Sequence, residues 1–282
     1  MPSLAYAQLE ITTHCNFACF YCAGRAMPQR HMSMDIFAGI LGRLPGTSLT
    51  VSLQGEGEPL LHPVFWEMVA AVKAAGHRPY TITNGSTVAH PQRIAAEFPE
   101  IGLSLDTLDA RFAESIGRLQ MDRVLRNLDR LLDCMDASRI VIHTVDMGQP
   151  LGPVSRLVSD RGLKHLIQPL QRKDDYRRHY SPVTALVPAM ATPRPMIQSN
   201  QCASPAVCGY VQRNTMRYFN VDGVEMLCPF IKDVQGYAGL EPLRNSFAEG
   251  RAPSCCSGCA ELERPSAGLR SPSPMTHRQP AR

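Results

Sequence analysis

The 282-residue sequence lacks the features that would tie it to a membrane or to nucleic acid. It has a single tryptophan, and aromatic residues make up only 6% of the chain. No apolar run approaches the roughly 18 residues that indicate a membrane-spanning helix, and residues 1–14 have neither the charged nor the apolar region of a secretory signal. The formal net charge of +4 is too small to indicate a nucleic-acid surface. We therefore expect a cytoplasmic protein with no membrane or nucleic-acid partner.

Cysteine, by contrast, is abundant, with ten residues in the chain. In a reducing compartment, clustered cysteines more commonly bind metal or carry out redox chemistry than form disulfides. Apolar residues make up 44% of the chain and charged residues 19%, which excludes a disordered or fibrous class. The composition therefore favours a globular metal or redox protein.

Short apolar runs alternate with helix-like stretches up to residue 171, which predicts an α/β fold. Strands are expected at residues 7–13, 49–53, 80–83, 101–105, 139–145 and 165–168, and helices at 34–44, 63–75, 90–98, 119–135 and 153–161. Such alternation predicts a parallel sheet with helices outside it. Six units are fewer than the eight of a closed TIM barrel, so a partial (β/α)6 barrel and a doubly wound sheet both fit the pattern.

The composition changes after residue 171, which suggests a division into regions. Residues 172–201 are densely charged and then rich in proline, as is typical of a linker. Residues 202–263 hold six of the cysteines and, at Asp222-Gly223, a hairpin signal. Residues 264–282 contain no acidic residue and few large apolar ones, so we expect a disordered tail. The charges of residues 172–179 could line the mouth of the barrel, but a solvated loop is the commoner arrangement.

Cys15, Cys19 and Cys22 form a C-x3-C-x2-C motif directly after the first predicted strand. Three thiolates on a short loop can hold three irons of a [4Fe–4S] cluster and leave the fourth iron open. An open coordination position can bind a small molecule. A zinc loop without its fourth ligand, or coincidence, is the alternative interpretation.

This motif and its surroundings resemble the radical S-adenosylmethionine (SAM) superfamily, over roughly residues 7–171. In that family the three cysteines hold a [4Fe–4S] cluster that chelates SAM, and cleavage of SAM gives a 5′-deoxyadenosyl radical that abstracts hydrogen from a substrate carbon. The resemblance implies a partial TIM-like barrel, SAM as cofactor and an electron donor of the flavodoxin or ferredoxin type.

A second motif of the family follows the second predicted strand. Residues 55–59 read Gly-Glu-Gly-Glu-Pro and resemble the GGEP motif, which the family uses for the amino group of SAM. Gly57 and Glu58 match the motif, whereas Glu56 stands where the first glycine is usual. This departure puts the local backbone geometry in doubt.

The resemblance assigns four further residues to the SAM site. Asn84 belongs to a Thr-Asn-Gly motif, Ser104 and Asp106 match polar positions that reach the ribose and carboxylate, and Tyr21 matches the aromatic residue placed against the adenine. Each of these alone is a common turn or cap. Their order at the ends of successive strands is what carries weight, because parallel α/β sheets bind ligands at the carboxyl ends of their strands.

The C-terminal cysteines resemble the SPASM/Twitch extension, which carries auxiliary [4Fe–4S] clusters. No cysteine follows Cys259, which favours the shorter Twitch type with one auxiliary cluster. A structural zinc site is the alternative, because cysteine spacing alone does not distinguish zinc from iron–sulfur. The four expected ligands are Cys208, Cys228, Cys256 and Cys259, with Cys202 as an alternate ligand.

Two further cysteines and one histidine are considered for a structural or catalytic role. Cys134 lies on the long predicted helix and is expected to be a small buried residue. Cys255 is adjacent to an expected ligand, and its weak S–H bond could return a hydrogen atom to a carbon radical, although an alternate ligand or a bystander is the simpler interpretation. His143 could face the barrel interior, but a packed or hydrogen-bonded residue is the simpler interpretation.

The resemblance extends to enzymes that tailor aminocyclitol and aminoglycoside antibiotics. It suggests a carbohydrate-like substrate, by analogy alone, and the cysteines left over from the two ligand sets favour epimerisation with Cys255 as hydrogen donor. A dehydrogenase acting on a sugar alcohol, and a peptide maturase that forms a thioether or carbon–carbon crosslink, are the alternatives. The first strand begins almost at once, so we expect no leader-peptide-binding domain. An electron carrier without SAM would have no need of the motifs after strands two to four.

Overall fold

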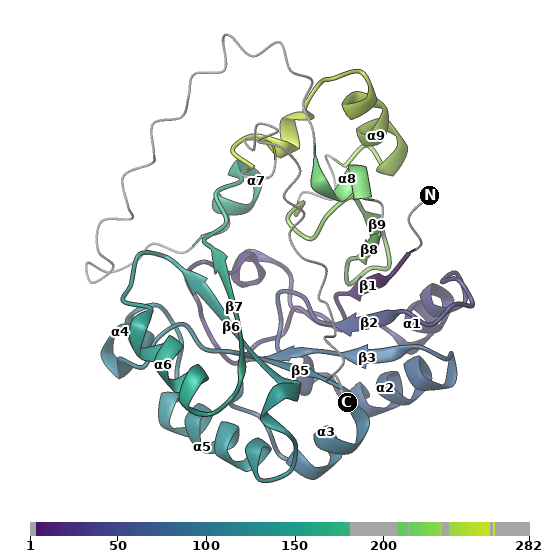
Figure 1. The fold of residues 1–282 in the computed structure, drawn as a ribbon. Helices are drawn as coiled ribbons and strands as arrows, with labels where there is room; N and C mark the ends of the chain where they lie inside the picture. Colours follow the sequence, from purple (N-terminus) through teal and green to yellow (C-terminus); the bar gives the residue numbers. More distant parts are fainter. Residues whose placement is uncertain (1–3, 181–207, 214, 233–236, 260–261, 263–282) are drawn as a thin grey trace, which may run out of the picture.

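The computed structural model describes residues 4–180, 208–213, 215–232, 237–259 and 262 (Figure 1). The alternate ligand Cys202, residues 181–201 of the expected linker and the expected tail lie outside the described residues. The division of the chain at residues 171, 201 and 263 stays a prediction.

Parallel strands follow one another around the sheet in chain order. The strands are β1 (Tyr6–Leu9), β2 (Thr50–Leu53), β3 (Arg78–Tyr80), β4 (Ile82–Thr83), β5 (Ile101–Ser104), β6 (Ile140–Asp146) and β7 (Lys164–Pro169). β3 and β4 are two parts of one strand, interrupted at Thr81. Each strand pairs in parallel with the next. Because the order never reverses, the sheet is the predicted partial (β/α)6 barrel and not a doubly wound sheet.

Helices cover the outer side of this curved sheet (Figure 1). They are α1 (Met34–Leu41), α2 (Phe65–Ala74), α3 (Pro91–Glu97), α4 (Ala110–Ser115), α5 (Met121–Leu132) and α6 (Gly152–Asp160), with 3-10 turns at Ala23–Ala26, Pro59–Leu61 and Ala137–Arg139. Ser33 is the N-cap of α1, since its hydroxyl oxygen accepts from the Ile36 N–H at 3.3 Å. α4 was not predicted from the sequence, because six residues are too few to show helical periodicity. Its N-cap is Asp109, which accepts from two backbone N–H groups.

The alternation of residues along the strands separates an apolar outer face from a polar inner face. Ala7 and Leu9 of β1, with Val51 and Leu53 of β2, have no solvent exposure and pack into the main core beneath the helices. The residues between them therefore point to the inside of the barrel.

The C-terminal region adds two strands to the sheet that contains β1. The expected hairpin is present as β8 (Met216–Phe219) and β9 (Glu225–Met226), which are antiparallel. β8 also pairs in parallel with β1, with Tyr6 opposite Met216. The remaining helices are α7 (Asp174–Arg177), α8 (Gly209–Arg213) and α9 (Leu240–Ala248), with a 3-10 turn at Ser254–Cys256. Among the described helices, none is long and apolar enough to cross a membrane.

The expectation of a solvated loop at residues 172–179 holds only in part. Arg172, Asp174, Arg177 and Arg178 are exposed, but Lys173 is fully buried and Asp175 is only 4% exposed. The Lys173 ammonium group donates to the Asp175 carboxylate at 3.1 Å and to the Phe230 carbonyl oxygen at 3.0 Å. Buried charges persist where they are paired and hydrogen-bonded, so one side of this stretch docks onto the C-terminal region while the other faces water.

Candidate functional site

The loop that carries Cys15, Cys19 and Cys22 follows β1 and is clamped by the segment after α4. The backbone N–H of Ala18 donates to the Gly117 carbonyl oxygen, and that of Phe20 to the Ile116 carbonyl oxygen, both at 3.1 Å. A further bond, from the Cys22 N–H to the Cys19 carbonyl oxygen, closes the end of the loop. The three cysteines are thus presented together at the carboxyl end of the first strand, as predicted.

Each thiol of this loop contacts a protein group from a different motif. Cys22 Sγ donates to the Glu56 carboxylate at 3.2 Å, and Cys19 Sγ lies 3.8 Å from the Gly117 carbonyl oxygen. Cys15 Sγ accepts from the Asn84 side-chain amide at 3.8 Å. Across the described ranges, no three His, Cys, Asp or Glu side chains are drawn together closely enough to hold a metal ion as they stand.

The donor chemistry of the loop nevertheless fits an iron–sulfur cluster. Burial raises the pKa of all three thiols, and a neighbouring cysteine adds to the rise at Cys19 and at Cys22. As thiolates, Cys15 and Cys19 would repel each other, and so would Cys19 and Cys22. Such a set is stabilised in its deprotonated form when iron binds, which matches a [4Fe–4S] cluster held by three cysteines.

The residue 55–59 loop packs against the loop that bears the cysteines. The N–H of Gly57 donates to the Thr12 carbonyl oxygen at 3.1 Å, and that of Glu58 to the His14 carbonyl oxygen at 2.7 Å. A Cβ atom on Gly57 would lie 2.5 Å from both carbonyl oxygens. Only glycine therefore permits this approach, and the second glycine of the motif has a physical reason.

Glu58 ties the second motif to the third. Its carboxylate accepts from the Thr83 hydroxyl at 2.7 Å and from the Asn84 backbone N–H at 2.6 Å. The side chain is 2% exposed. Its role in this structure is to fix the loop after β4 against residues 55–59.

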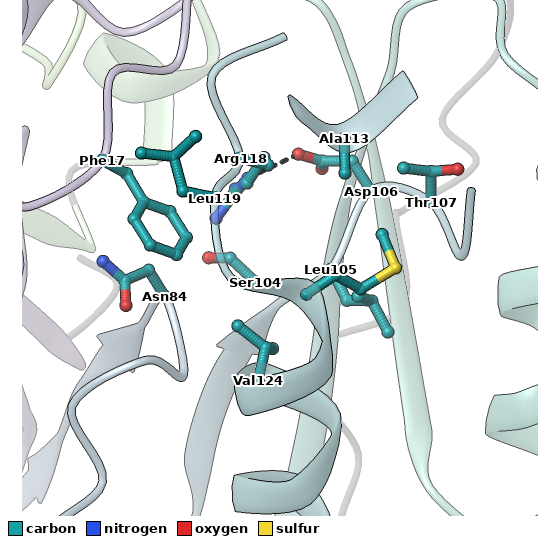
Figure 2. Close-up of a pocket in the computed structure, with 11 residues that line it drawn as sticks. Phe17, Asn84, Ser104, Leu105, Asp106, Thr107, Ala113, Arg118, Leu119 and Val124 are labelled. Atoms are coloured by element: carbon teal, nitrogen blue, oxygen red, sulfur yellow. Dashed lines mark hydrogen bonds and ion pairs between the residues drawn. The ribbon is translucent and has the colours of Figure 1, made fainter. Parts of the chain in front are cut away.

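A small pocket lies beside these loops (Figure 2). Of the residues expected to bind SAM, Asn84, Ser104 and Asp106 line it, whereas Tyr21, Gly57 and Glu58 do not. The other lining residues are Phe17, Leu105, Thr107, Ala113, Arg118, Leu119, Met121 and Val124. The structure thus brings together three of the residues predicted to bind SAM: Asn84, which follows β4, and Ser104 and Asp106, at the end of β5.

Arg118 supplies the positive charge of this pocket and was missed in the sequence. Its Nε donates to Asp106 Oδ2 at 2.8 Å and to the Tyr21 hydroxyl oxygen at 2.9 Å, and the Tyr21 hydroxyl itself donates to Asp106. In Figure 2 a nitrogen of Arg118 points toward the space between Phe17 and Ser104. Tyr21 and Asp106 therefore act as supports that orient Arg118. A lone arginine between two helices carries no sequence signal of this role.

The inner face of the barrel carries a row of neutral polar side chains. Gln8 of β1 is in register with Ser52 of β2 and with Tyr218 of β8. Ser52 is in turn in register with Tyr80 of β3. From the other side of the barrel, His143 of β6 is joined to the Tyr80 hydroxyl at 2.8 Å through its Nε2 atom.

His143 Nδ1 and Gln54 Oε1 are among the polar atoms of this interior that are buried without a hydrogen-bond partner. Burial lowers the pKa of His143 to about 4, with a second contribution from His165, so the imidazole is neutral near pH 7. Unpaired buried polar groups are costly and rare. The interior of the barrel therefore has hydrogen-bonding atoms that no protein group uses. His143 faces this interior, and its Nε2 atom, unlike its Nδ1 atom, is hydrogen-bonded.

The C-terminal cysteines Cys208, Cys228, Cys256 and Cys259 are all buried. Burial raises the pKa of Cys228 to about 12, and the thiols of Cys208 and Cys259 add to the rise. The buried Lys173 ammonium group counteracts part of it. A close set of thiols beside a fixed cation fits an anionic iron–sulfur centre in its donor chemistry.

Cys255 is half-buried, and its Sγ lies 4.0 Å from that of Cys256. This hydrogen bond lowers the pKa of the Cys255 thiol. The pocket of Figure 2 is not lined by Cys255. Cys134 is half-buried beyond the C-cap of α5, so the expectation that it is buried is wrong.

Comparison with known proteins places these features in context. A family model described as the radical SAM superfamily matches residues 9–150. The S-adenosylmethionine-dependent nucleotide dehydratase of Selenomonas ruminantium is 26% identical over 148 residues, which are 50% of this chain and 54% of that protein. The GTP 3′,8-cyclase of Chlorobaculum tepidum is 31% identical over 134 residues, 45% of this chain and 41% of that protein. The chain therefore spans about half of these relatives or less.

One solved structure illustrates the likeness in fold. Streptococcus suis SuiB bound to its precursor peptide SuiA superposes with a TM-score of 0.60 at 12% sequence identity. The superposition covers 88% of this chain and 65% of SuiB. At this identity the likeness concerns the fold alone.

Proposed function

The chain belongs to the radical SAM superfamily, and we propose that it uses SAM to abstract a hydrogen atom from a carbon of a neutral, polar small molecule. The observation that carries the proposal is the position of the three-cysteine loop. It stands at the carboxyl end of β1, beside the pocket lined by Asn84, Ser104 and Arg118. Ligands of parallel α/β sheets bind at this end of the strands.

When bound, SAM and a [4Fe–4S] cluster held by Cys15, Cys19 and Cys22 supply a 5′-deoxyadenosyl radical. The chain contributes binding and orientation. The amide of Asn84 and the hydroxyl of Ser104 suit the polar groups of SAM, and the guanidinium of Arg118 suits its carboxylate. Asp106 and Tyr21 keep Arg118 in place.

The barrel interior supports a neutral, hydroxyl-rich substrate. The in-register row of Gln8, Ser52 and Tyr80 offers hydrogen-bond donors and acceptors without net charge. His143 and Gln54 add buried polar atoms that lack a partner. A site with unpaired polar groups favours a ligand that supplies hydroxyl or amide groups. A carbohydrate-like or aminocyclitol substrate has this chemistry.

Epimerisation is the proposed outcome, with Cys255 as the hydrogen donor. Cys255 would donate the hydrogen atom of its thiol to the face of the substrate carbon opposite the one that lost its hydrogen. Cys208, Cys228, Cys256 and Cys259 would hold an auxiliary cluster, which would supply the electron that, together with one proton from solvent, restores the Cys255 thiol. The contact between Cys255 and Cys256 supports this route.

The experiment is anaerobic reconstitution with iron and sulfide, followed by reduction in the presence of SAM. The wild type is expected to release 5′-deoxyadenosine, and Cys19→Ala is expected not to. Retained SAM cleavage in Cys19→Ala contradicts the site. A panel of aminocyclitols, nucleotides and peptides then identifies the substrate class, and a neutral sugar or cyclitol is the expected hit.

Deuterated water separates the three possible reactions on that substrate. An epimer that carries deuterium in the wild type but not in Cys255→Ala supports epimerisation. A product two hydrogens lighter than the substrate indicates a dehydrogenase instead. A crosslinked peptide indicates a maturase.

A further inference from the structure

Lys232 is a fully buried cation that joins the C-terminal region to the SAM site. It follows β9, and its side chain is 2% exposed. The Nζ atom lies 2.7 Å from Glu56 Oε1 and 3.9 Å from Glu10 Oε1. The rings of Tyr176 and Tyr218 flank it, with centroids 5.7 and 5.6 Å away. Lys232 therefore reaches from the C-terminal region to the loop of residues 55–59.

Glu56 occupies the position at which this chain departs from the family motif. Its carboxylate accepts from Cys22 Sγ at 3.2 Å and from the Tyr176 hydroxyl at 3.0 Å. Gly24 makes room for it, since a Cβ atom there would lie 2.5 Å from Glu56 Cβ. The substituted residue is thus accommodated by the chain around it, and it links a cysteine of the cluster loop to Lys232.

The buried charges of Glu56 and Lys232 stabilise each other. A carboxylate buried beside a thiol is costly unless a cation compensates it. Lys232 is the nearest such cation to Glu56, and its own backbone N–H is held by Asp175 Oδ2 at 2.9 Å. Removal of one partner leaves an uncompensated buried charge, which costs more than removal of both.

We propose that Lys232 is a positioning residue of the SAM site. Through Glu56 it holds the loop of residues 55–59 in place, so that SAM binding depends on the docked C-terminal region. This inference rests on the proposed function for the identity of the ligand, but not for the coupling between the two segments.

The test uses full-length protein and three variants. Lys232→Met keeps most of the side-chain volume and removes the charge. The double variant Glu56→Gln with Lys232→Met removes both charges and keeps polar atoms beside Tyr176 and Cys22. Arg217→Met is the matched control, because it breaks a different ion pair of the C-terminal region, the one with Glu225 in the hairpin of β8 and β9, away from residues 55–59.

Two measurements are made on each protein. Hydrogen–deuterium exchange over residues 54–62 reports on the loop before any cluster is loaded. Equilibrium binding of SAM and iron content report on the reconstituted site.

Lys232→Met is expected to exchange faster over residues 54–62 and to bind SAM about 10- to 100-fold more weakly. The double variant is expected to recover SAM affinity to within about twofold of the wild type, and Arg217→Met to match the wild type in both readouts. Wild-type exchange and affinity in Lys232→Met overturn the proposal, as does a double variant as impaired as Lys232→Met. If the wild type itself binds no SAM, the proposed function fails, and the exchange data alone decide whether Lys232 holds the loop.

Discussion

The backbone N–H of Ala18 donates to the carbonyl oxygen of Gly117 across 3.1 Å, and a side chain at position 117 would destroy this contact. Gly117 has φ of 80°, and a Cβ atom there would lie 2.0 Å from the Ala18 carbonyl oxygen. The three-cysteine loop is therefore clamped by a position that only glycine can fill.

Gly117→Ala is expected to destabilise the protein and to release the cluster loop. The left-handed conformation alone costs roughly 1–2 kcal/mol for a residue with a Cβ, and the clash with Ala18 adds to it. Thermal unfolding and iron content after reconstitution measure the two effects. Gly148→Ala is the control, because φ is 96° there but nothing lies within 4 Å of the added Cβ. Equal losses in the two variants would show that the contact with Ala18 is irrelevant.

Cys256→Ala is expected to halve the iron content. Two [4Fe–4S] clusters correspond to about eight irons per chain, and loss of one leaves about four. Chemical iron analysis of reconstituted protein decides the point, and Cys134→Ala, outside both cysteine groups, is expected to keep all of them. A wild-type value near four that Cys256→Ala leaves unchanged argues against an auxiliary cluster.

Arg118→Met is expected to weaken SAM binding about 10- to 100-fold while the clusters stay intact, as is usual when a charged partner of a ligand is lost. The reason is that Arg118 supplies the guanidinium group of the pocket. Equilibrium binding of SAM gives the affinity. Arg111→Met, at an exposed position of α4, is the control. Unchanged affinity in Arg118→Met removes Arg118 from the site.

His143 is expected to make the stability of the fold depend on pH. Burial lowers its pKa from 6.5 to about 4, so between these values the unfolded chain binds a proton that the folded chain does not. This contribution to stability is complete above pH 6.5 and is lost as the pH falls toward 4. Urea unfolding across this range measures it. His143→Asn is expected to flatten that part of the profile, and an identical slope in the variant would contradict the assignment.

The sequence was informative where periodicity and motif order coincide. All six barrel strands and the cysteine loop lie where their patterns predicted them, although the strand boundaries differ by one to several residues. α4 escaped prediction because it is too short for periodicity. Arg118 escaped it because its role depends on Asp106 and Tyr21, which are distant in sequence.

The burial of Lys173 within a charged stretch could not be predicted for a different reason. A run of charged residues usually faces water, and only a three-dimensional arrangement can supply a buried partner such as Asp175. The same holds for Glu56, whose effect was expected on the backbone alone. Its carboxylate instead forms an ion pair with Lys232, some 175 residues away in the chain.

The parallel pairing of β1 with β8 sets an order of events during synthesis. Tyr6 and Met216 are opposite each other in the sheet but about 210 residues apart in the chain. At the usual pace of translation, β1 waits roughly 10–40 s for this neighbour to be made. Until then one edge of the nascent barrel is open, at the strand that leads into the cysteine loop. Such a long-range pairing slows folding and leaves an exposed edge prone to aggregation.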